Sequence, residues 1–119
     1  MIEGLGVDIA EIERIWQANQ KTPRFKEKVL TKDELMVFAS LKKQRQKEFL
    51  AGRFSAKEAF SKALGTGIGS QVSFLDLSIL DSTSGQPKIY QTLYSGRVLV
   101  SISHTKCYVM TEVILEKEG

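Results

Sequence analysis

The spacing of hydrophobic positions changes twice along this chain and divides it into three parts. Residues 2–9 alternate, which predicts a strand with an apolar side and a side of small or acidic residues: Leu5, Val7 and Ile9 against Gly4, Gly6 and Asp8. Residues 10–64 repeat mostly at helical spacing, and short alternating runs return after residue 69. One strand, several helices and then an antiparallel sheet predict an α+β fold with a long central helix packed on the sheet.

The longest helical stretch covers residues 49–64 and has two different faces. One face is apolar and contains Phe49, Ala56, Phe60 and Ala63. The opposite face carries Phe54, Glu58, Ser61 and Lys62. Three glycines, Gly65, Gly67 and Gly69, then release the chain from helical geometry and allow a ligand to approach the backbone. A charged helix that ends at such a turn indicates a binding site.

Shorter elements fill the rest of the pattern. A helix is predicted over residues 10–20, a short helix opens near Pro23, and a capping box at Thr31 and Glu34 predicts another. The turn formers of DSTSGQ lie between two strand-like runs, residues 72–80 and 87–90, and predict a hairpin. Two last strands, 98–103 and 108–115, flank the loop SHTKC.

Length and charge limit the class of protein. With 119 residues the chain fits a single domain, 1–119, and no apolar run approaches the roughly 20 residues of a membrane span. The first residues lack the pattern of a signal peptide and Cys107 is the only cysteine, so we expect a cytoplasmic protein. A net charge of +3 favours small phosphorylated ligands or an acidic protein, and is too small to indicate DNA binding.

Asp8 and Glu58 are the candidate chemical groups, and each has an ordinary alternative. Asp8, at the end of the first strand, is placed either to bind a ligand or to cap the next helix. Glu58 lies four residues before Lys62, which alone indicates a stabilising helical ion pair. Together the two carboxylates suit Mg²⁺, which proteins usually hold by one or two carboxylates while water and phosphate oxygens complete the shell.

Basic side chains gather at two places in the helical part. Lys42, Lys43, Arg45 and Lys47 precede the long helix, and a second group contains Arg14, Lys21, Arg24 and Lys28. Either group is consistent with a solvated surface, and the first group could also bind a phosphate. His104, the only histidine, lies in a loop and has no evident task from its position alone.

Three segments carry a family resemblance: GVDIAEIERI, FLAGRFSAKEAFSKALGTGIG and VSISHTKCYVMTEVILEK. They contain an Asp after Gly-Val, then Phe, two residues, Lys-Glu and a second Lys, here Asp8, Phe54, Lys57, Glu58 and Lys62. Over essentially its whole length the chain resembles the holo-[acyl-carrier-protein] synthases, the short 4'-phosphopantetheinyl transferases of bacterial fatty acid synthesis. The resemblance implies that coenzyme A donates 4'-phosphopantetheine to a serine of acyl carrier protein, leaving adenosine 3',5'-bisphosphate.

The resemblance also implies roles for particular residues. Asp8 and Glu58 would bind Mg²⁺, either Glu58 or a metal-bound water would take the serine proton, and Lys62 would steady or protonate the leaving phosphate. The coenzyme site would be formed by Lys57, Ser61, Gly65, Thr66 and Gly67, with its adenosine and 3'-phosphate end at Arg45, Arg53, His104 and Thr105. Carrier protein would dock on Arg14, Lys21, Arg24, Phe25 and Lys28.

The family forms homotrimers whose active sites lie between subunits, and the same assembly is expected here. Many relatives have alanines where this chain has Val109, Met110 and Thr111, so we expect the subunit packing to differ there. A non-catalytic basic module that binds an acidic protein or nucleic acid is the alternative, and it should tolerate Glu58→Gln. A different magnesium–nucleotide enzyme is disfavoured because the GxxxxGK[ST] motif is absent.

Overall fold

The computed structural model describes residues 1–118, and its helices and strands confirm the predicted α+β class. In chain order the elements are β1 (Ile2–Glu11), α1 (Ile12–Lys21), α2 (Phe25–Val29), α3 (Lys32–Ala39), α4 (Lys43–Leu64), a 3₁₀ turn η1 (Phe74–Asp76), β2 (Ser78–Asp81), β3 (Pro87–Tyr90), β4 (Arg97–His104) and β5 (Tyr108–Glu116). The long helix α4 begins at Lys43, so the basic run belongs to its first turns.

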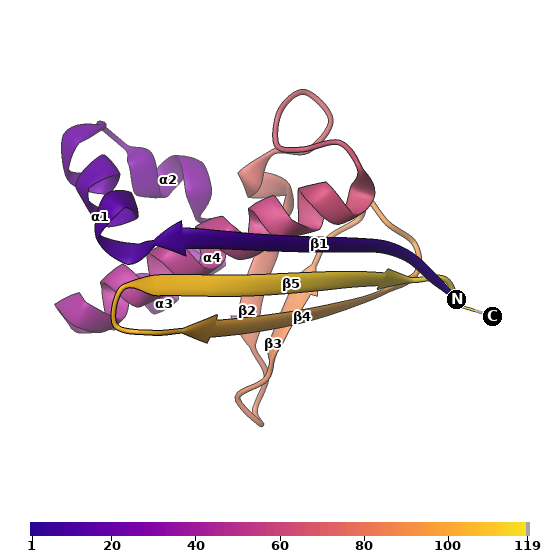
Figure 1. Cartoon of the computed structure of the whole chain (residues 1–119). Coiled ribbons are helices and arrows are strands. Elements are labelled where there is room, and N and C mark those ends of the chain that lie inside the picture. Colours follow the sequence, from indigo (N-terminus) through magenta and orange to yellow (C-terminus); the bar gives the residue numbers. More distant parts are fainter. Residues whose placement is uncertain (119) are drawn as a thin grey trace.

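The first strand joins the last two in an antiparallel sheet of order β1-β5-β4, and α4 crosses one face of this sheet (Figure 1). β1 pairs with β5 so that Asp8 lies opposite Thr111. Along β1 and β5, residues facing the helix are largely enclosed, whereas alternate residues are exposed on the other face. That open face is apolar, and its exposed side chains include Leu5, Val7, Ile9, Leu99 and Met110.

Two glycines allow β1 to lie directly against α4. Gly4 and Gly6 occupy the helix-facing side of the strand, as the alternation predicted. A Cβ atom at Gly6 would overlap the carbonyl oxygen of Ala59 and lie 2.8 Å from the amide nitrogen of Ala63. Only a residue without a side chain fits at this position. The next residue on this side of the strand is Asp8, which therefore also faces α4.

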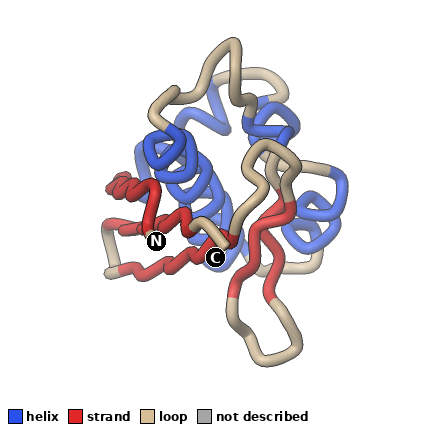
Figure 2. The backbone as a smooth tube through the Cα atoms, turned by 90° about the vertical axis from the view of Figure 1, so that its right-hand side faces the viewer, coloured by secondary structure: helices blue, strands red, loops and turns tan. Residues whose placement is uncertain are grey.

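The remaining elements surround α4 (Figure 2). The helices α1, α2 and α3 pack about its first half, where an apolar cluster contains Trp16, Leu30, Phe38 and Leu50. The predicted hairpin is confirmed as β2–β3, and it forms a two-stranded sheet separate from the β1-β5-β4 sheet. The run 72–80 is not one strand, because Ser73 caps the turn η1 and the strand begins only at Ser78.

The capping box predicted at Thr31 and Glu34 is confirmed. Thr31 accepts the amide of Glu34, and the Glu34 carboxylate accepts the amide of Thr31. Residues 1–118 contain no helix with both the length and the apolar character needed to cross a membrane.

Candidate active site

The side chain of Asp8 is fixed by two side chains of α4, one of which also contacts β5. Its Oδ1 accepts a hydrogen bond from Lys62 Nζ at 3.1 Å, and its Oδ2 accepts one from Ser55 Oγ at 2.8 Å. Ser55 Oγ is also 2.8 Å from Thr111 Oγ1 on β5. The capping alternative for Asp8 is wrong, because the helix starts at Ile12 and its N-cap is Glu11. Asp8 instead lies within β1 and faces α4.

Glu58 lies on α4, half-buried, and interacts electrostatically with Asp8. Its pKa is raised, first because burial disfavours the charged form and then because the negative charge of Asp8 is near, while Lys62 opposes the shift. The ion pair made by Lys62 is with Asp8, and its Nζ also donates to the Val7 carbonyl. Lys62 therefore pairs with the carboxylate of β1, and its positive charge also acts on Glu58, four residues earlier on the same helix.

The donor set at this place fits a hard divalent cation such as Mg²⁺. Within residues 1–118 no group of three or more His, Cys, Asp or Glu side chains could hold a metal ion. A cation at this place would have two protein ligands, Asp8 and Glu58. Water and substrate oxygens would supply the other ligands. Burial is the main cause of the raised pKa of Glu58 and the negative charge of Asp8 is the second, and a cation bound by both carboxylates would oppose that shift.

Asp8→Asn should lower the pKa of Glu58, because the substitution removes a nearby negative charge and keeps the shape of the side chain. Lys62→Met should raise it, because the opposing ammonium charge is lost. The measurement is a carbon NMR titration of the Glu58 carboxyl in metal-free protein. Equal pKa values in all three proteins would show that the carboxylates are too far apart to share an ion.

A second polar site lies on another side of α4. Arg45, Arg53 and His104 line a pocket of about 150 Å³, together with Asp81 and residues of α3 and α4. Arg53 donates from Nε to the Ile79 carbonyl at 3.1 Å, and its guanidinium lies 4.1 Å from the centre of the Phe49 ring. Burial lowers the Arg53 pKa, which Asp81 opposes. Both arginines are paired with carboxylates of the pocket, Arg45 with Glu48 at 3.6 Å and Arg53 with Asp81 at 3.4 Å, and a guanidinium group can also bind a phosphate.

The turn after α4 has the glycine-dependent geometry that the sequence predicted. Gly65 and Gly67 have φ of 85° and 70°, and the carbonyl of Ser61 accepts the amides of Thr66 and Gly67. Ser61 itself is buried and its hydroxyl donates to the Glu58 carbonyl, so it does not belong to the exposed polar face predicted for it. Thr105 is exposed in the β4–β5 turn, where its hydroxyl oxygen accepts the amides of Cys107 and Tyr108.

Lys57 requires a correction, because the structure places it in the interior. Its side chain is fully buried, and its Nζ donates to the Val29 carbonyl and to Glu34 Oε1, each at 2.6 Å. Burial lowers its pKa, and the Glu34 carboxylate opposes that shift. Lys57 cannot line an open coenzyme site from this position. Sequence reasoning identified Glu34 only as a cap, and it missed Ser55 and Thr111, whose hydroxyls carry no distinctive pattern.

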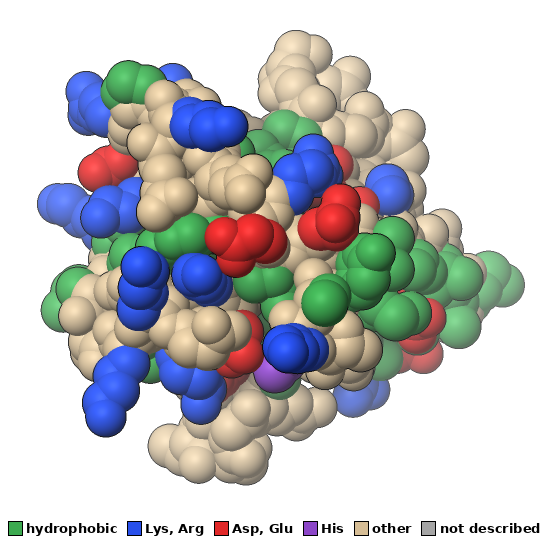
Figure 3. Space-filling view, turned by 60° about the vertical axis from the view of Figure 1, so that its left-hand side comes forward, with side chains coloured by type: hydrophobic (Ala, Val, Ile, Leu, Met, Phe, Trp, Pro, Cys, Tyr) green, Lys and Arg blue, Asp and Glu red, His purple; other side chains and the backbone are tan. Residues whose placement is uncertain are grey.

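The predicted docking residues form a basic surface beside the carboxylates. Four are exposed on or next to α1 and α2: Arg14, Lys21, Arg24 and Lys28. Lys and Arg side chains gather on one part of the face shown in Figure 3, and hydrophobic side chains gather on another. Phe25 is stacked on Phe54 with the ring centres 6.1 Å apart. Since Phe54 is one helical turn before Glu58, α2 adjoins the helix face that bears the carboxylate.

The strand–helix carboxylate pair, the neighbouring lysine and the arginine pocket are groups suited to a phosphate-containing ligand. The profile of the 4'-phosphopantetheinyl transferase superfamily matches residues 4–113, and the chain belongs to this family.

Relatives that match over nearly the whole chain identify the type of enzyme within this superfamily. The chain is 57% identical over 117 residues to the holo-[acyl-carrier-protein] synthase of Limosilactobacillus fermentum, covering 98% of both chains. It is 53% identical over 117 residues to that of Latilactobacillus sakei, covering 98% of this chain and 99% of the relative. A Bacillus anthracis holo-(acyl-carrier-protein) synthase crystallised with CoA (3',5'-ADP) superposes with a TM-score of 0.93 at 45% identity, with 99% of each chain covered. The protein is therefore an enzyme of the holo-[acyl-carrier-protein] synthase type.

Proposed function

We propose that this enzyme transfers 4'-phosphopantetheine from coenzyme A to a serine of apo acyl carrier protein, in a Mg²⁺-dependent reaction that releases adenosine 3',5'-bisphosphate. The observation that carries the proposal is the pairing of Asp8 of β1 with Lys62 of α4, with Glu58 near enough for its pKa to respond to both charges. The Bacillus anthracis relative, crystallised with CoA (3',5'-ADP), supports the coenzyme assignment. A cytoplasmic role in fatty acid synthesis belongs to the same proposal.

In the proposed reaction the serine oxygen forms a bond to the phosphorus that carries pantetheine. The bond from this phosphorus to the bridging oxygen breaks, and that oxygen leaves with adenosine 3',5'-bisphosphate. Glu58 takes the serine proton, acting as the general base. Lys62 places its positive charge beside the phosphate that leaves. Positioning and charge neutralisation supply most of the catalysis in such transfers.

Asp8 and Glu58 would hold the Mg²⁺ ion. Bound there, Mg²⁺ supplies positive charge that neutralises the carboxylates and the coenzyme diphosphate. Ser55 and Thr111 keep the second oxygen of Asp8 in place, so the carboxylate does not need to reorient when the coenzyme binds.

The arginine pocket and the carboxylate pair point in different directions, which supports a site shared between subunits. Arg53 and Glu58 are five residues apart on α4, so their side chains project roughly 140° apart around the helix axis. We propose that a homotrimer brings the Arg45, Arg53 and His104 pocket of one subunit to the carboxylates of the next. The open apolar face of the sheet would form the subunit contact. Of the three residues expected to alter this packing, Met110 is exposed there, whereas Val109 and Thr111 are buried.

We propose that the basic surface of α1 and α2 docks acyl carrier protein, which carries acidic residues. The double substitution Arg14→Glu/Lys28→Glu should raise the KM for the carrier roughly tenfold with little change in kcat, because steering charges act mainly on association. Steady-state kinetics at two salt concentrations measures the effect, which should shrink at high salt. The matched control is Lys88→Glu, an exposed charge on the β2–β3 hairpin. An equal effect of the control would contradict the docking assignment.

The test of the function is mass spectrometry of apo acyl carrier protein incubated with this enzyme, coenzyme A and Mg²⁺. The carrier should gain the mass of one phosphopantetheine group, and adenosine 3',5'-bisphosphate should appear in equal amount. A chelator should prevent both changes, and a carrier without its acceptor serine should not react. An unchanged carrier mass would contradict the proposed reaction. It would favour the alternative, a non-catalytic basic module.

A further inference from the structure

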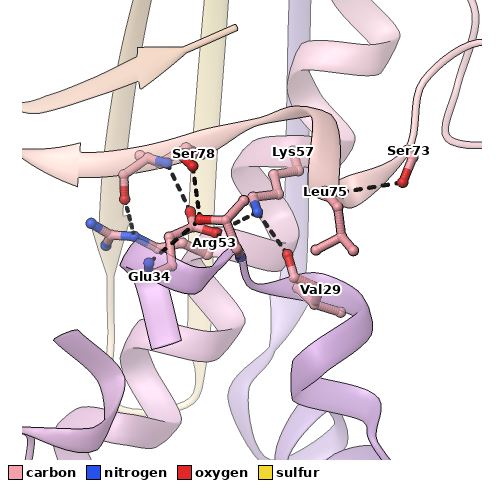
Figure 4. Close-up of polar contacts among 9 residues, drawn as sticks. Val29, Glu34, Arg53, Lys57, Ser73, Leu75 and Ser78 are labelled. Atoms are coloured by element: carbon pink, nitrogen blue, oxygen red, sulfur yellow. Dashed lines mark hydrogen bonds and ion pairs between the residues drawn. The ribbon is translucent and has the colours of Figure 1, made fainter. Parts of the chain in front are cut away.

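Lys57 and Glu34 form a fully buried ion pair beneath the arginine pocket. Both side chains have no exposed surface, and Lys57 Nζ lies 2.6 Å from Glu34 Oε1 (Figure 4). Removing two charges from water is costly, and an apolar pair of similar volume is often as stable. Stability alone therefore gives a weak reason for an ion pair at this place.

The Glu34 carboxylate ties together three elements that are separate in the sequence. Its Oε1 accepts the Thr31 amide at the start of α3 and the Lys57 ammonium from α4. Its Oε2 accepts the amide of Ile79 on β2 at 2.7 Å. Ser78, the neighbour of Ile79, donates its hydroxyl to Thr31 Oγ1 at 2.7 Å. The carboxylate thus holds β2 against the start of α3.

The peptide groups of Ile79 connect this carboxylate to Arg53. The Ile79 amide is held by Glu34, and the Ile79 carbonyl accepts the Arg53 Nε–H at 3.1 Å. The second contact of the Arg53 guanidinium on this strand is with the Asp81 carboxylate, at 3.4 Å. The direction in which Arg53 points into its pocket therefore depends on where β2 lies.

We propose that Glu34 is a positioning residue that acts through Ile79 to orient Arg53 toward the phosphate of the coenzyme. The inference rests on the proposed function, in which the pocket of Arg45, Arg53 and His104 takes the adenosine 3'-phosphate end. Lys57 balances the carboxylate charge, and the essential feature of Glu34 is an oxygen acceptor for the Ile79 amide. A leucine at position 34 could fill the volume and could not hold the strand.

Two double variants separate the acceptor from the charge. Glu34→Leu/Lys57→Met removes the ion pair and the acceptor, whereas Glu34→Gln/Lys57→Met removes the ion pair and keeps an oxygen for the Ile79 amide. Calorimetry should show that the leucine variant binds adenosine 3',5'-bisphosphate about tenfold more weakly, as expected for one misplaced charge-assisted hydrogen bond. The glutamine variant should bind within about twofold of the unchanged enzyme, and KM for coenzyme A should follow the same order with little change in kcat.

The dependence on Arg53 gives an independent readout. In an Arg53→Ala background, Glu34→Leu/Lys57→Met should cause no additional loss of affinity, because the group that Glu34 positions is already absent. Val113→Ala, a core substitution on β5 that removes none of the hydrogen bonds of Glu34, Ile79 or Arg53, is the control for general destabilisation and should leave the affinity unchanged. Thermal unfolding of every variant accompanies the binding measurements.

Equal affinities of the two double variants, whether weak or strong, would overturn the inference, as would additive losses in the Arg53→Ala background. If the leucine variant does not fold, Glu34→Asp replaces it, because the shorter side chain keeps the charge and withdraws the oxygen from the Ile79 amide. Tight binding by that variant would equally overturn the inference. An unchanged enzyme that does not bind adenosine 3',5'-bisphosphate would overturn the proposed function as well. Weaker binding by Arg53→Ala alone would leave the function standing.

Discussion

Glu58→Gln lowers kcat for phosphopantetheine transfer by about 10²- to 10⁴-fold, the range for loss of a general base, and leaves the fold intact. The substitution removes the base and one of the two carboxylate oxygen donors, while the amide occupies the same volume. Single-turnover transfer to acyl carrier protein, followed by mass spectrometry, measures the loss. Glu13→Gln, a surface residue paired with Lys47, is the matched control and should retain full activity. Activity that survives Glu58→Gln would favour the non-catalytic alternative.

The same substitution should raise the thermal stability of the metal-free protein at neutral pH. Because the pKa of Glu58 is raised in the folded protein, the folded state binds the proton more tightly than the unfolded chain does. The free energy of unfolding therefore falls as pH rises from the unfolded pKa, near 4.5, through the higher folded value. A neutral glutamine avoids this loss, so its advantage in Tm should be present at pH 7 and absent at pH 4.

Gly6→Ala should destabilise the enzyme by about 1–3 kcal/mol or more, the usual cost of forcing extra atoms into a packed interior. The new methyl group would overlap the Ala59 carbonyl, which belongs to helix backbone and cannot rotate away. Thermal or urea unfolding measures the change. Gly69→Ala is the matched control, because a Cβ there has no neighbour within 4 Å and the backbone has no positive φ.

Gly6→Ala should also reduce transfer activity at temperatures where the protein remains folded. Relief of the overlap requires β1 to move away from α4, and this movement carries Asp8 away from Lys62 and Ser55. Unfolding free energy equal to that of the unchanged enzyme would show that the strand and helix do not pack as closely as described.

Much of the fold was predictable because its signals are local. The alternation of β1 placed Gly4, Gly6 and Asp8 on one side, and the helix does lie against that side. The capping box and the glycine turn after α4 also depend on residues only a few positions apart. The prediction of one strand over residues 72–80 was wrong, because Ser73 and Asp76 close a local turn that competes with extended backbone.

The site was harder to predict, because helical spacing gives the direction of a side chain and does not give its partner. The family resemblance placed Lys57 at the coenzyme site and Glu58, the next residue on α4, at the metal. They project about 100° apart, and this difference places Lys57 against α3 and Glu58 beside Asp8. Lys62 paired with Asp8, 54 positions away, and the helical neighbour four residues away was not its partner.

The sequence by itself determined the elements, the close-packed glycine side of β1 and, through its motifs, the family and most of the residues that carry the proposed chemistry. The tertiary structure alone decided which charged groups face the substrate and which serve the interior. The physical reason is that periodicity depends on neighbours along the chain, whereas burial depends on what distant segments bring to the same place. Glu34 shows this: its local pattern indicates a helix cap, and only the arrival of α4 and β2 makes it the acceptor that holds Lys57 and Ile79.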